Sequence, residues 1–196
     1  MNTALVVVDM QKAFCNPEGS FQRRGYVIEN IGKIIEQCIN LRKFADETGW
    51  TVFFTRLVYS EGYQGAGLLV QNNPQIRQLG GYIEGSPDSM IIDELTPKQG
   101  DIVINKNRFD PFITTTFYDQ LCQFRIKKIV VCGVCTNICV ESTVRGAFDR
   151  DIRVIIAEDA VTSYSKELHQ ASLETLRGFF ASVLSVAKIE ESFRRI

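Results

Sequence analysis

Three reactive side chains each come near the end of a short run of apolar, mostly β-branched residues. Asp9 ends the first of these runs, Lys106 comes just after the third, and Cys139 comes shortly after the fourth. Because ligands of open parallel sheets bind beyond the carboxyl ends of the strands, we expect the three side chains at one edge of one sheet. A thiol beside an amine and a carboxylate indicates nucleophilic chemistry at sulfur.

Taken alone, each residue has an ordinary structural explanation. Asp9 could cap a loop, Lys106 could be a solvated surface residue, and Cys139 could be a small buried apolar residue. Their coincidence favours catalysis. A free thiol has a pKa of about 8.5, and we expect Cys139 in the first turn of a helix capped by Thr136 or Asn137, where the helix dipole favours a thiolate. Lys106 would lower the thiol pKa further, and Asp9 would carry the proton to the leaving group.

The elements that must position these residues alternate between strands and helices. Nearly continuous apolar runs predict buried parallel strands at Ala4–Val8, Thr51–Thr55, Ile102–Ile104, Lys128–Cys132, Ile152–Ala157 and Ala181–Val186. Apolar stripes at helical spacing predict helices between them, at Ile31–Ala45 with Gly49 as C-cap, at Phe117–Phe124, and at Leu168–Phe179 with Ser165 as N-cap. The predicted fold is α/β, with a parallel sheet between two helical layers in a single domain over residues 1–196.

The stretch Leu57–Gly100 does not fit this alternation, because glycine and proline interrupt it throughout. It is either a wandering surface connection with one short helix or a lid over the site, since long loops in small domains are often functional.

Composition excludes several classes of protein. The 196 residues carry a formal net charge of −1, with 45% hydrophobic and 23% charged residues, so nucleic acid is not an expected partner. No apolar stretch is long enough to span a membrane, and the N-terminus does not resemble a signal peptide. The six cysteines fit free thiols in a reducing compartment, so we expect a cytoplasmic protein.

Four segments resemble the isochorismatase-like cysteine hydrolases, and together they span nearly the whole chain. They are Val7-Val8-Asp9-Met10-Gln11 with Phe14, Lys106-Asn107-Arg108-Phe109 with Phe112, Gly133–Thr143, and Glu158-Asp159-Ala160.

The resemblance implies a six-stranded, Rossmann-like parallel sheet and a catalytic triad of Asp9, Lys106 and Cys139. It also implies a cis peptide between Val134 and Cys135, with the backbone amides of Cys135 and Cys139 forming the oxyanion hole. It points to a homo-oligomer, a dimer or a tetramer, and to no cofactor.

Departures from the family pattern narrow the expected chemistry. Family members that hydrolyse nicotinamide hold a metal through an aspartate and histidines after the second strand, but this chain has Thr55–Tyr59 there. Its one histidine, His169, is expected on an exposed helix face. No metal is therefore expected. Isochorismatases of the family lack the thiol, whereas Asn137–Arg145 looks most like members that act on ureido, carbamoyl or biuret-type amides.

The predicted function is hydrolysis of a carbon–nitrogen bond of a small amide, ureido or N-carbamoyl compound through a thioester at Cys139. An isochorismatase or nicotinamidase activity is the alternative within the family.

Five residues near strand ends are candidates for binding the substrate. They are Phe14, Arg56, Phe109, Thr136 and Tyr164. Arg56 could bind a substrate carboxylate through two parallel hydrogen bonds, or it could be a structural ion-pair partner.

Two further classes of protein compete with the hydrolase. Cys132 and Cys135 form a C-x-x-C pair between a strand and a helix, as in redox proteins, and with Cys139 they could bind an iron–sulfur cluster. A non-catalytic protein that kept the fold is the other possibility, but it has no reason to retain Asp9, Lys106 and Cys139.

Overall fold

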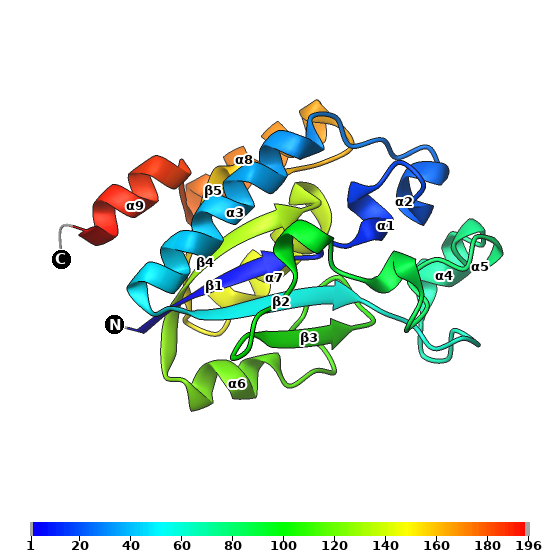
Figure 1. Cartoon of the computed structure of the whole chain (residues 1–196), viewed down its shortest axis with the longest axis horizontal. Coiled ribbons are helices and arrows are strands. Elements are labelled where there is room, and N and C mark those ends of the chain that lie inside the picture. Colours follow the sequence, from blue (N-terminus) through cyan, green and yellow to red (C-terminus); the bar gives the residue numbers. More distant parts are fainter. Residues whose placement is uncertain (1, 195–196) are drawn as a thin grey trace.

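The computed structural model describes residues 2–194, which form a six-stranded parallel sheet with helices on both faces (Figure 1). The strands are β1 (Asn2–Val8), β2 (Thr51–Leu57), β3 (Ile102–Lys106), β4 (Ile126–Val134), β5 (Arg153–Thr162) and β6 (Ser182–Leu184). Their order across the sheet is β3-β2-β1-β4-β5-β6. The predicted α/β class with a six-stranded parallel sheet is confirmed.

This strand order places the switch in winding direction between β1 and β4. Val8 of β1 is in register with Gly133 of β4 on one side and with Thr55 of β2 on the other. In doubly wound sheets the ligand crevice lies at the switch, outside the carboxyl ends of the strands. The fold therefore directs the site to the residues that follow Val8 and Gly133.

The connecting segments contain nine α-helices among the described residues. They are α1 (Lys12–Cys15), α2 (Ser20–Arg23), α3 (Ile31–Thr48), α4 (Leu68–Asn72), α5 (Gln75–Gln78), α6 (Phe117–Gln123), α7 (Glu141–Phe148), α8 (Lys166–Phe179) and α9 (Val186–Arg194). Two 3₁₀ turns, η1 (Pro87–Ser89) and η2 (Asp93–Leu95), and one π-turn, η3 (Thr136–Val140), complete them.

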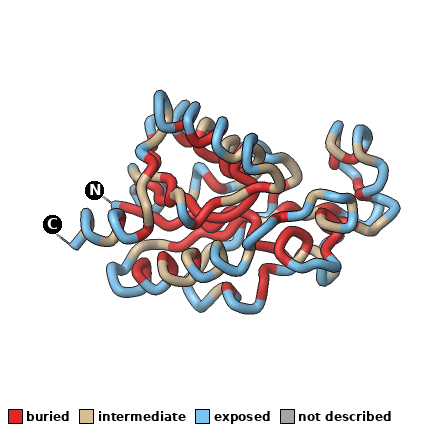
Figure 2. The backbone as a smooth tube through the Cα atoms, turned by 90° about the horizontal axis from the view of Figure 1, so that it is seen from above, coloured by how far each residue is buried: buried red, intermediate tan, exposed pale blue. Residues whose placement is uncertain are grey.

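The side chains of β1 alternate between two apolar layers, as expected of a strand covered on both faces. Leu5 and Val7 belong to the cluster that includes α3 and α9, whereas Ala4, Val6 and Val8 belong to the cluster that includes α6, α7 and α8. Figure 2 shows the buried backbone concentrated in the strands of the sheet. A central strand held on both faces makes a rigid base for the residue that follows it.

Both predicted caps are present, but one helical stripe differs from the prediction. Gly49 ends α3 in the left-handed conformation, and the Ser165 hydroxyl accepts a hydrogen bond from the backbone N–H of Leu168 (3.2 Å). On α8, however, Leu168 and Phe179 are exposed, and Leu176 is buried together with neighbours outside the predicted stripe. The small Ser172 faces inward beside Leu173, which turns the buried face away from Leu168.

Residues 58–100 form a folded segment that contains α4, α5, η1 and η2, so the first alternative, a wandering connection with one short helix, is wrong. Tyr63 is buried at its centre, with its hydroxyl 3.1 Å from the carbonyl oxygen of Ile76 and 2.9 Å from that of Gly81. The segment lies near α1 and α2 at the carboxyl end of the sheet (Figure 1). This position agrees with a cover for the site, while movement as a lid stays a prediction.

Candidate active site

Asp9, Lys106 and Cys139 converge at the carboxyl edge of the sheet and are almost wholly buried, with 0%, 2% and 3% exposure. Lys106 lies between the other two: its Nζ is 2.7 Å from Asp9 Oδ2 and 3.4 Å from Cys139 Sγ. The Lys106 Nζ also donates to the carbonyl oxygen of Arg108 (3.3 Å). Three segments far apart in the sequence thus bring a carboxylate, an ammonium and a thiol together.

Asp9 is held by β2, the neighbour of its own strand. Its backbone N–H donates to the carbonyl oxygen of Thr55 (3.1 Å), and the Thr55 hydroxyl donates to Asp9 Oδ1 (2.7 Å). With a φ of 50°, Asp9 is in the left-handed region, which turns the chain sharply after Val8. One carboxylate oxygen therefore faces Thr55 and the other faces Lys106.

The turn after β4 positions Cys139. Gly133 has a φ of 113°, and a Cβ there would lie 2.1 Å from the carbonyl oxygen of Val8, so only glycine fits between the two central strands. The peptide bond between Val134 and Cys135 is cis. The Cys135 carbonyl then accepts hydrogen bonds from the N–H groups of Ile138 (3.0 Å) and Val140 (3.2 Å), which closes η3 around Cys139.

The predicted cap of this turn is wrong, because neither candidate side chain caps it. Thr136 is fully buried, with Oγ1 2.8 Å from Nδ1 of His169, and Asn137 accepts a hydrogen bond from the Ser163 hydroxyl. Cys139 lies in the π-turn just before α7 rather than in a first helical turn. His169 is half-buried by its contact with Thr136, and not simply exposed.

The electrostatics of the buried cluster also differ from the expectation. Burial raises the pKa of the Cys139 thiol well above its ordinary value, and the Asp9 carboxylate raises it further, while Lys106 acts in the opposite direction without offsetting them. Burial disfavours the charged form of Lys106 too, yet Asp9 and Cys139 hold its pKa above the ordinary value. These directions favour a neutral thiol beside a Lys106–Asp9 ion pair in the resting cluster.

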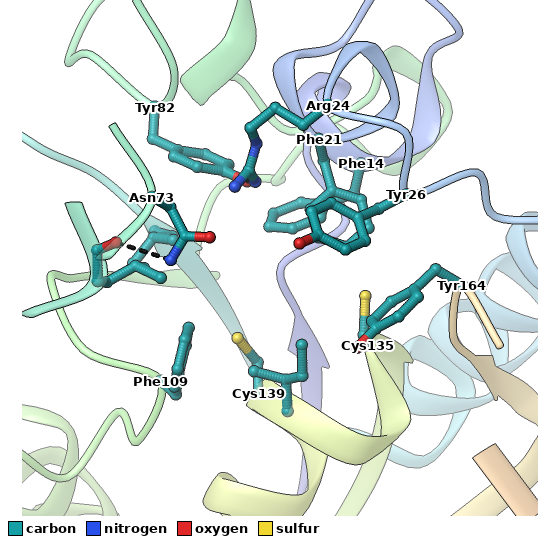
Figure 3. A pocket seen from close by; sticks show the side chains of 13 residues that line it. Phe14, Phe21, Arg24, Tyr26, Asn73, Tyr82, Phe109, Cys135, Cys139 and Tyr164 are labelled. Carbon is teal, nitrogen blue, oxygen red and sulfur yellow. Dashed lines mark hydrogen bonds between the residues drawn. The ribbon is translucent and has the colours of Figure 1, made fainter. Parts of the chain in front are cut away.

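A cavity of about 190 Å³ opens directly onto the sulfur of Cys139. Figure 3 shows aromatic side chains and Arg24 around it, with Cys135 and Cys139 on the opposite side from Arg24. The volume is below the about 300–1,000 Å³ of sites for drug-sized ligands, which limits the cavity to small molecules. Its walls are formed by Phe14, Phe21, Arg24, Tyr26, Leu57, Leu69, Asn73, Tyr82, Phe109, Cys135, Ile138, Cys139 and Tyr164.

The candidate substrate-binding residues divide into two groups. Phe14, Phe109 and Tyr164 line the cavity. Arg56 does not line it, and its Nε donates to Asn105 Oδ1 (2.7 Å). Among residues 2–194 no carboxylate lies within 4.0 Å of Arg56, so the ion pair that was the alternative is not found there either. Thr136 is also absent from the walls, because its side chain points back toward α8.

Sequence reasoning missed most of the cavity wall. Phe21, Arg24 and Tyr26 come from α2 and the turn after it, and Asn73 and Tyr82 come from the folded segment 58–100. The one available signal was the short spacing of two aromatic residues and an arginine after the first strand. Their direction toward the site depends on tertiary structure that no local pattern records.

The alternative roles of the cysteines find no support in the geometry. Cys132 is buried in β4 with its thiol beside Cys38 of α3, whereas Cys135 faces the cavity, and all six cysteines are free thiols. Among residues 2–194 there is no group of three or more histidine, cysteine or acidic side chains that could hold a metal ion.

A doubly wound sheet with a thiol, an ammonium and a carboxylate at its switch point is the arrangement of an α/β cysteine hydrolase. Residues 3–188 match the family model of the isochorismatase domain, so the chain belongs to the isochorismatase family. The predicted family and hydrolase class are confirmed.

Relatives within the family are named for one activity. The chain is 32% identical over 205 residues to the ureidoacrylate amidohydrolase RutB of Methylobacterium radiotolerans, covering 97% of this chain and 79% of that protein. It is 31% identical over 209 residues to RutB of Azorhizobium caulinodans, covering 99% and 91%. Both relatives are named as amidohydrolases.

Solved structures share the fold over nearly the whole chain. A cysteine hydrolase from Pseudomonas syringae pv. phaseolicola has a TM-score of 0.87 at 26% identity, covering 97% of this chain and 91% of that one. The nicotinamidase PncA from Bacillus subtilis has a TM-score of 0.81 at 21% identity, covering 94% and 100%. The second likeness concerns the fold alone.

Proposed function

We propose that the chain is a cysteine amidohydrolase that cleaves a carbon–nitrogen bond of a small ureido or N-carbamoyl compound. The observation that carries the proposal is the position of Lys106 Nζ, 2.7 Å from Asp9 and 3.4 Å from the Cys139 sulfur, beside a small cavity. The RutB relatives, which are named for ureidoacrylate, support the substrate class.

In the first half of the reaction, Asp9 accepts the thiol proton while the Cys139 sulfur forms a bond to the substrate carbonyl carbon. The backbone N–H groups of Cys135 and Cys139 stabilise the oxyanion. The carbon–nitrogen bond then breaks, and Asp9 returns the proton to the departing nitrogen. Lys106 keeps its charge throughout and holds the carboxylate and the sulfur at hydrogen-bond distance.

In the second half, water gives a proton to Asp9 and attacks the carbon of the thioester. The sulfur–carbon bond breaks, the acid is released, and the sulfur recovers its proton from Asp9. With a ureido substrate, the Cys139-bound carbamoyl group leaves as carbamic acid, which decomposes to ammonia and carbon dioxide. Ammonia release therefore reports the complete cycle.

The test is ammonia release from a panel of ureidoacrylate, 3-ureidopropionate, biuret and nicotinamide, with isochorismate hydrolysis followed separately. Cys139→Ala should abolish turnover, and Asp9→Asn should lower it by about 10²- to 10⁴-fold through loss of proton transfer. Cys122→Ala is the matched control, because Cys122 is exposed and lies outside the cavity walls.

Mass spectrometry should detect an acyl or carbamoyl group on Cys139 after mixing with an active ureide. Turnover that survives Cys139→Ala would contradict the mechanism, and activity on nicotinamide or isochorismate alone would contradict the substrate class.

We also propose that the protein works in the cytoplasm as a homo-oligomer, a dimer or a tetramer. Its six free thiols support a reducing compartment. Of the helices described, none has both the length and the apolar character needed to cross a membrane. Light scattering of the purified protein tests the oligomer, and a monomeric mass would contradict it.

A further inference from the structure

Arg24 is the one charged side chain among the described residues that line the cavity. It follows α2, and Figure 3 shows its guanidinium directed inward, across the cavity from Cys139. Three aromatic rings surround the guanidinium, with Cζ 5.4 Å from the ring centres of Phe21 and Tyr26 and 5.9 Å from that of Tyr82. Such rings hold a guanidinium in place without neutralising its charge.

The charge of Arg24 has no acidic partner in the described part of the chain. Its hydrogen bonds go to neutral groups: Nε donates to the carbonyl oxygen of Ser20 (3.2 Å), and Nη2 donates to the Tyr82 hydroxyl (2.8 Å). No carboxylate of residues 2–194 lies within 4.0 Å of it, whereas Arg42 contacts two.

Asp88, which contacts both Ser20 and Tyr82, already has its own hydrogen-bond donors. Asp88 Oδ1 accepts a hydrogen bond from the backbone N–H of Ser20 (2.8 Å), and Oδ2 accepts from the Ser20 hydroxyl (2.6 Å) and from the backbone N–H of Tyr82 (2.7 Å). These bonds fix the two residues that position Arg24, and they leave its charge to be matched by something else.

The guanidinium keeps donors for that purpose. Of its five N–H groups, the two hydrogen bonds use one on Nε and one on Nη2, so both groups of Nη1 and the second group of Nη2 stay available. Adjacent donors on the two terminal nitrogens match the two oxygens of a carboxylate. Lys106 cannot serve instead, because its side chain is fully buried in the ion pair with Asp9.

We propose that Arg24 binds a carboxylate of the substrate, so that the substrate is a short N-carbamoyl or ureido carboxylic acid and not a neutral amide. The inference rests on the proposed function, in which Cys139 attacks the carbonyl group of the substrate at one end of the cavity. The carboxylate lies at the other end of the cavity, with a short connection between the two groups. The volume of about 190 Å³ excludes a long one.

The test compares 3-ureidopropionate with its neutral analogue 3-ureidopropionamide in the wild type and in three variants. Arg24→Gln should lower kcat/KM for the acid by about 10- to 100-fold, mainly through KM, and should change that for the neutral amide by less than about 3-fold. Arg24→Lys should retain part of the preference, because it keeps the charge but not the paired donors.

Arg23→Gln is the matched control. It removes the same charge from the adjacent position, but Arg23 is exposed and outside the cavity walls, so both substrates should react as in the wild type. The inference is overturned if the wild type does not prefer the acid, or if Arg24→Gln and Arg23→Gln alter the preference equally.

A binding measurement separates this inference from the proposed function. Iodoacetamide alkylation of Cys139, followed by mass spectrometry, should be slowed by 3-ureidopropionate more than by the amide, and Arg24→Gln should remove the difference. Arg24-dependent protection without ammonia release supports the carboxylate site and contradicts the hydrolase. Ammonia release without any dependence on Arg24 supports the hydrolase and overturns the carboxylate site.

Discussion

Removing the Lys106 ammonium should cost far more stability than removing an equally close ammonium at the surface. Lys106 Nζ lies 2.7 Å from Asp9 Oδ2, and both side chains are 0% exposed. Lys12 Nζ lies 2.8 Å from Asp93 Oδ1, but those side chains are 25% and 84% exposed. Lys106→Met and Lys12→Met therefore make the same chemical change in pairs of the same length that differ in burial.

The expected magnitudes follow from the partner that is left behind. Lys106→Met leaves the Asp9 carboxylate buried with the Thr55 hydroxyl as its side-chain donor, and breaking a buried pair in this way costs about 3–5 kcal/mol. Methionine fills most of the lysine volume, so lost packing adds little. Lys12→Met should cost about 0–1 kcal/mol, because water solvates Asp93. With about 2–4 °C per kcal/mol for a domain of this size, Tm should fall by roughly 6–20 °C in the first variant and at most about 4 °C in the second.

Urea unfolding at fixed protein concentration measures both free energies, and thermal scans give Tm. Two further variants, Asp9→Asn and the Asp9→Asn/Lys106→Met double variant, complete a double-mutant cycle. In the Asp9→Asn background no buried carboxylate is left unpaired, so adding Lys106→Met should cost less than it does in the wild type. The reasoning is refuted if Lys106→Met and Lys12→Met destabilise the chain equally, or if the Asp9→Asn background does not reduce the cost.

Three other outcomes can be checked with single variants or none. Because burial and Asp9 raise the pKa of Cys139, its rate of alkylation by iodoacetamide should still be rising at about pH 9, and a plateau below about pH 8 would contradict the neutral resting thiol. Gly133→Ala should lower the free energy of unfolding by about 3 kcal/mol or more, or fail to give soluble protein. Gly25→Ala, also at positive φ but in open space, should lower it by only about 1–2 kcal/mol. Equal urea midpoints of the two variants would contradict the close approach of β4 to β1. Burial lowers the pKa of His169, so its contribution to stability is present above about pH 6.5 and is lost as pH falls through the folded-state pKa. His169→Gln should therefore reduce the fall of Tm with pH below about pH 6.5. An unchanged slope of Tm against pH would show that other groups cause the dependence.

The strand pattern and the three reactive residues were predictable because both follow local rules. Buried parallel strands require continuous apolar runs, and those runs are present in the sequence wherever the structure has a strand. A residue just after such a strand must lie at the carboxyl edge of the sheet, whatever the rest of the chain does. Asp9 and Lys106 needed no more information than this, and Cys139 needed only a short turn after β4.

The alternation of side chains along a strand already predicts that Arg56 does not face the site. Successive side chains of β2 point to opposite faces, and Thr55 is the residue whose hydroxyl reaches Asp9. Arg56 must therefore point away from the Asp9 carboxylate, toward Asn105 of β3. A residue near the end of a strand can therefore face the site or face away from it, depending on which side of the sheet its side chain lies.

The cavity wall could not be predicted in the same way, because much of it comes from short helices and turns that lack a repeating sequence pattern. Arg24, Asn73 and Tyr82 are brought to the site by short helices and turns whose directions are set by contacts such as Asp88 with Ser20 and Tyr82. The residues proposed to recognise the substrate are therefore the ones that local sequence patterns predict least, whereas the proposed catalytic residues are the ones they predict best.

The protonation state of the Cys139 thiol also depends on tertiary contacts that the sequence does not reveal. From the sequence, a lysine near Cys139 predicts a lowered thiol pKa, because an ammonium favours a thiolate. In the folded chain that ammonium is shared with a carboxylate 2.7 Å away, and burial penalises a second negative charge beside the pair. Asp9 thereby raises the thiol pKa, and in the proposed mechanism it is also the base that takes the thiol proton. In the proposed mechanism the sulfur becomes nucleophilic only as its proton moves to Asp9, when the substrate carbonyl is there to accept the electrons. We therefore expect loss of Asp9 to lower the rate far more than loss of any aromatic residue of the cavity wall.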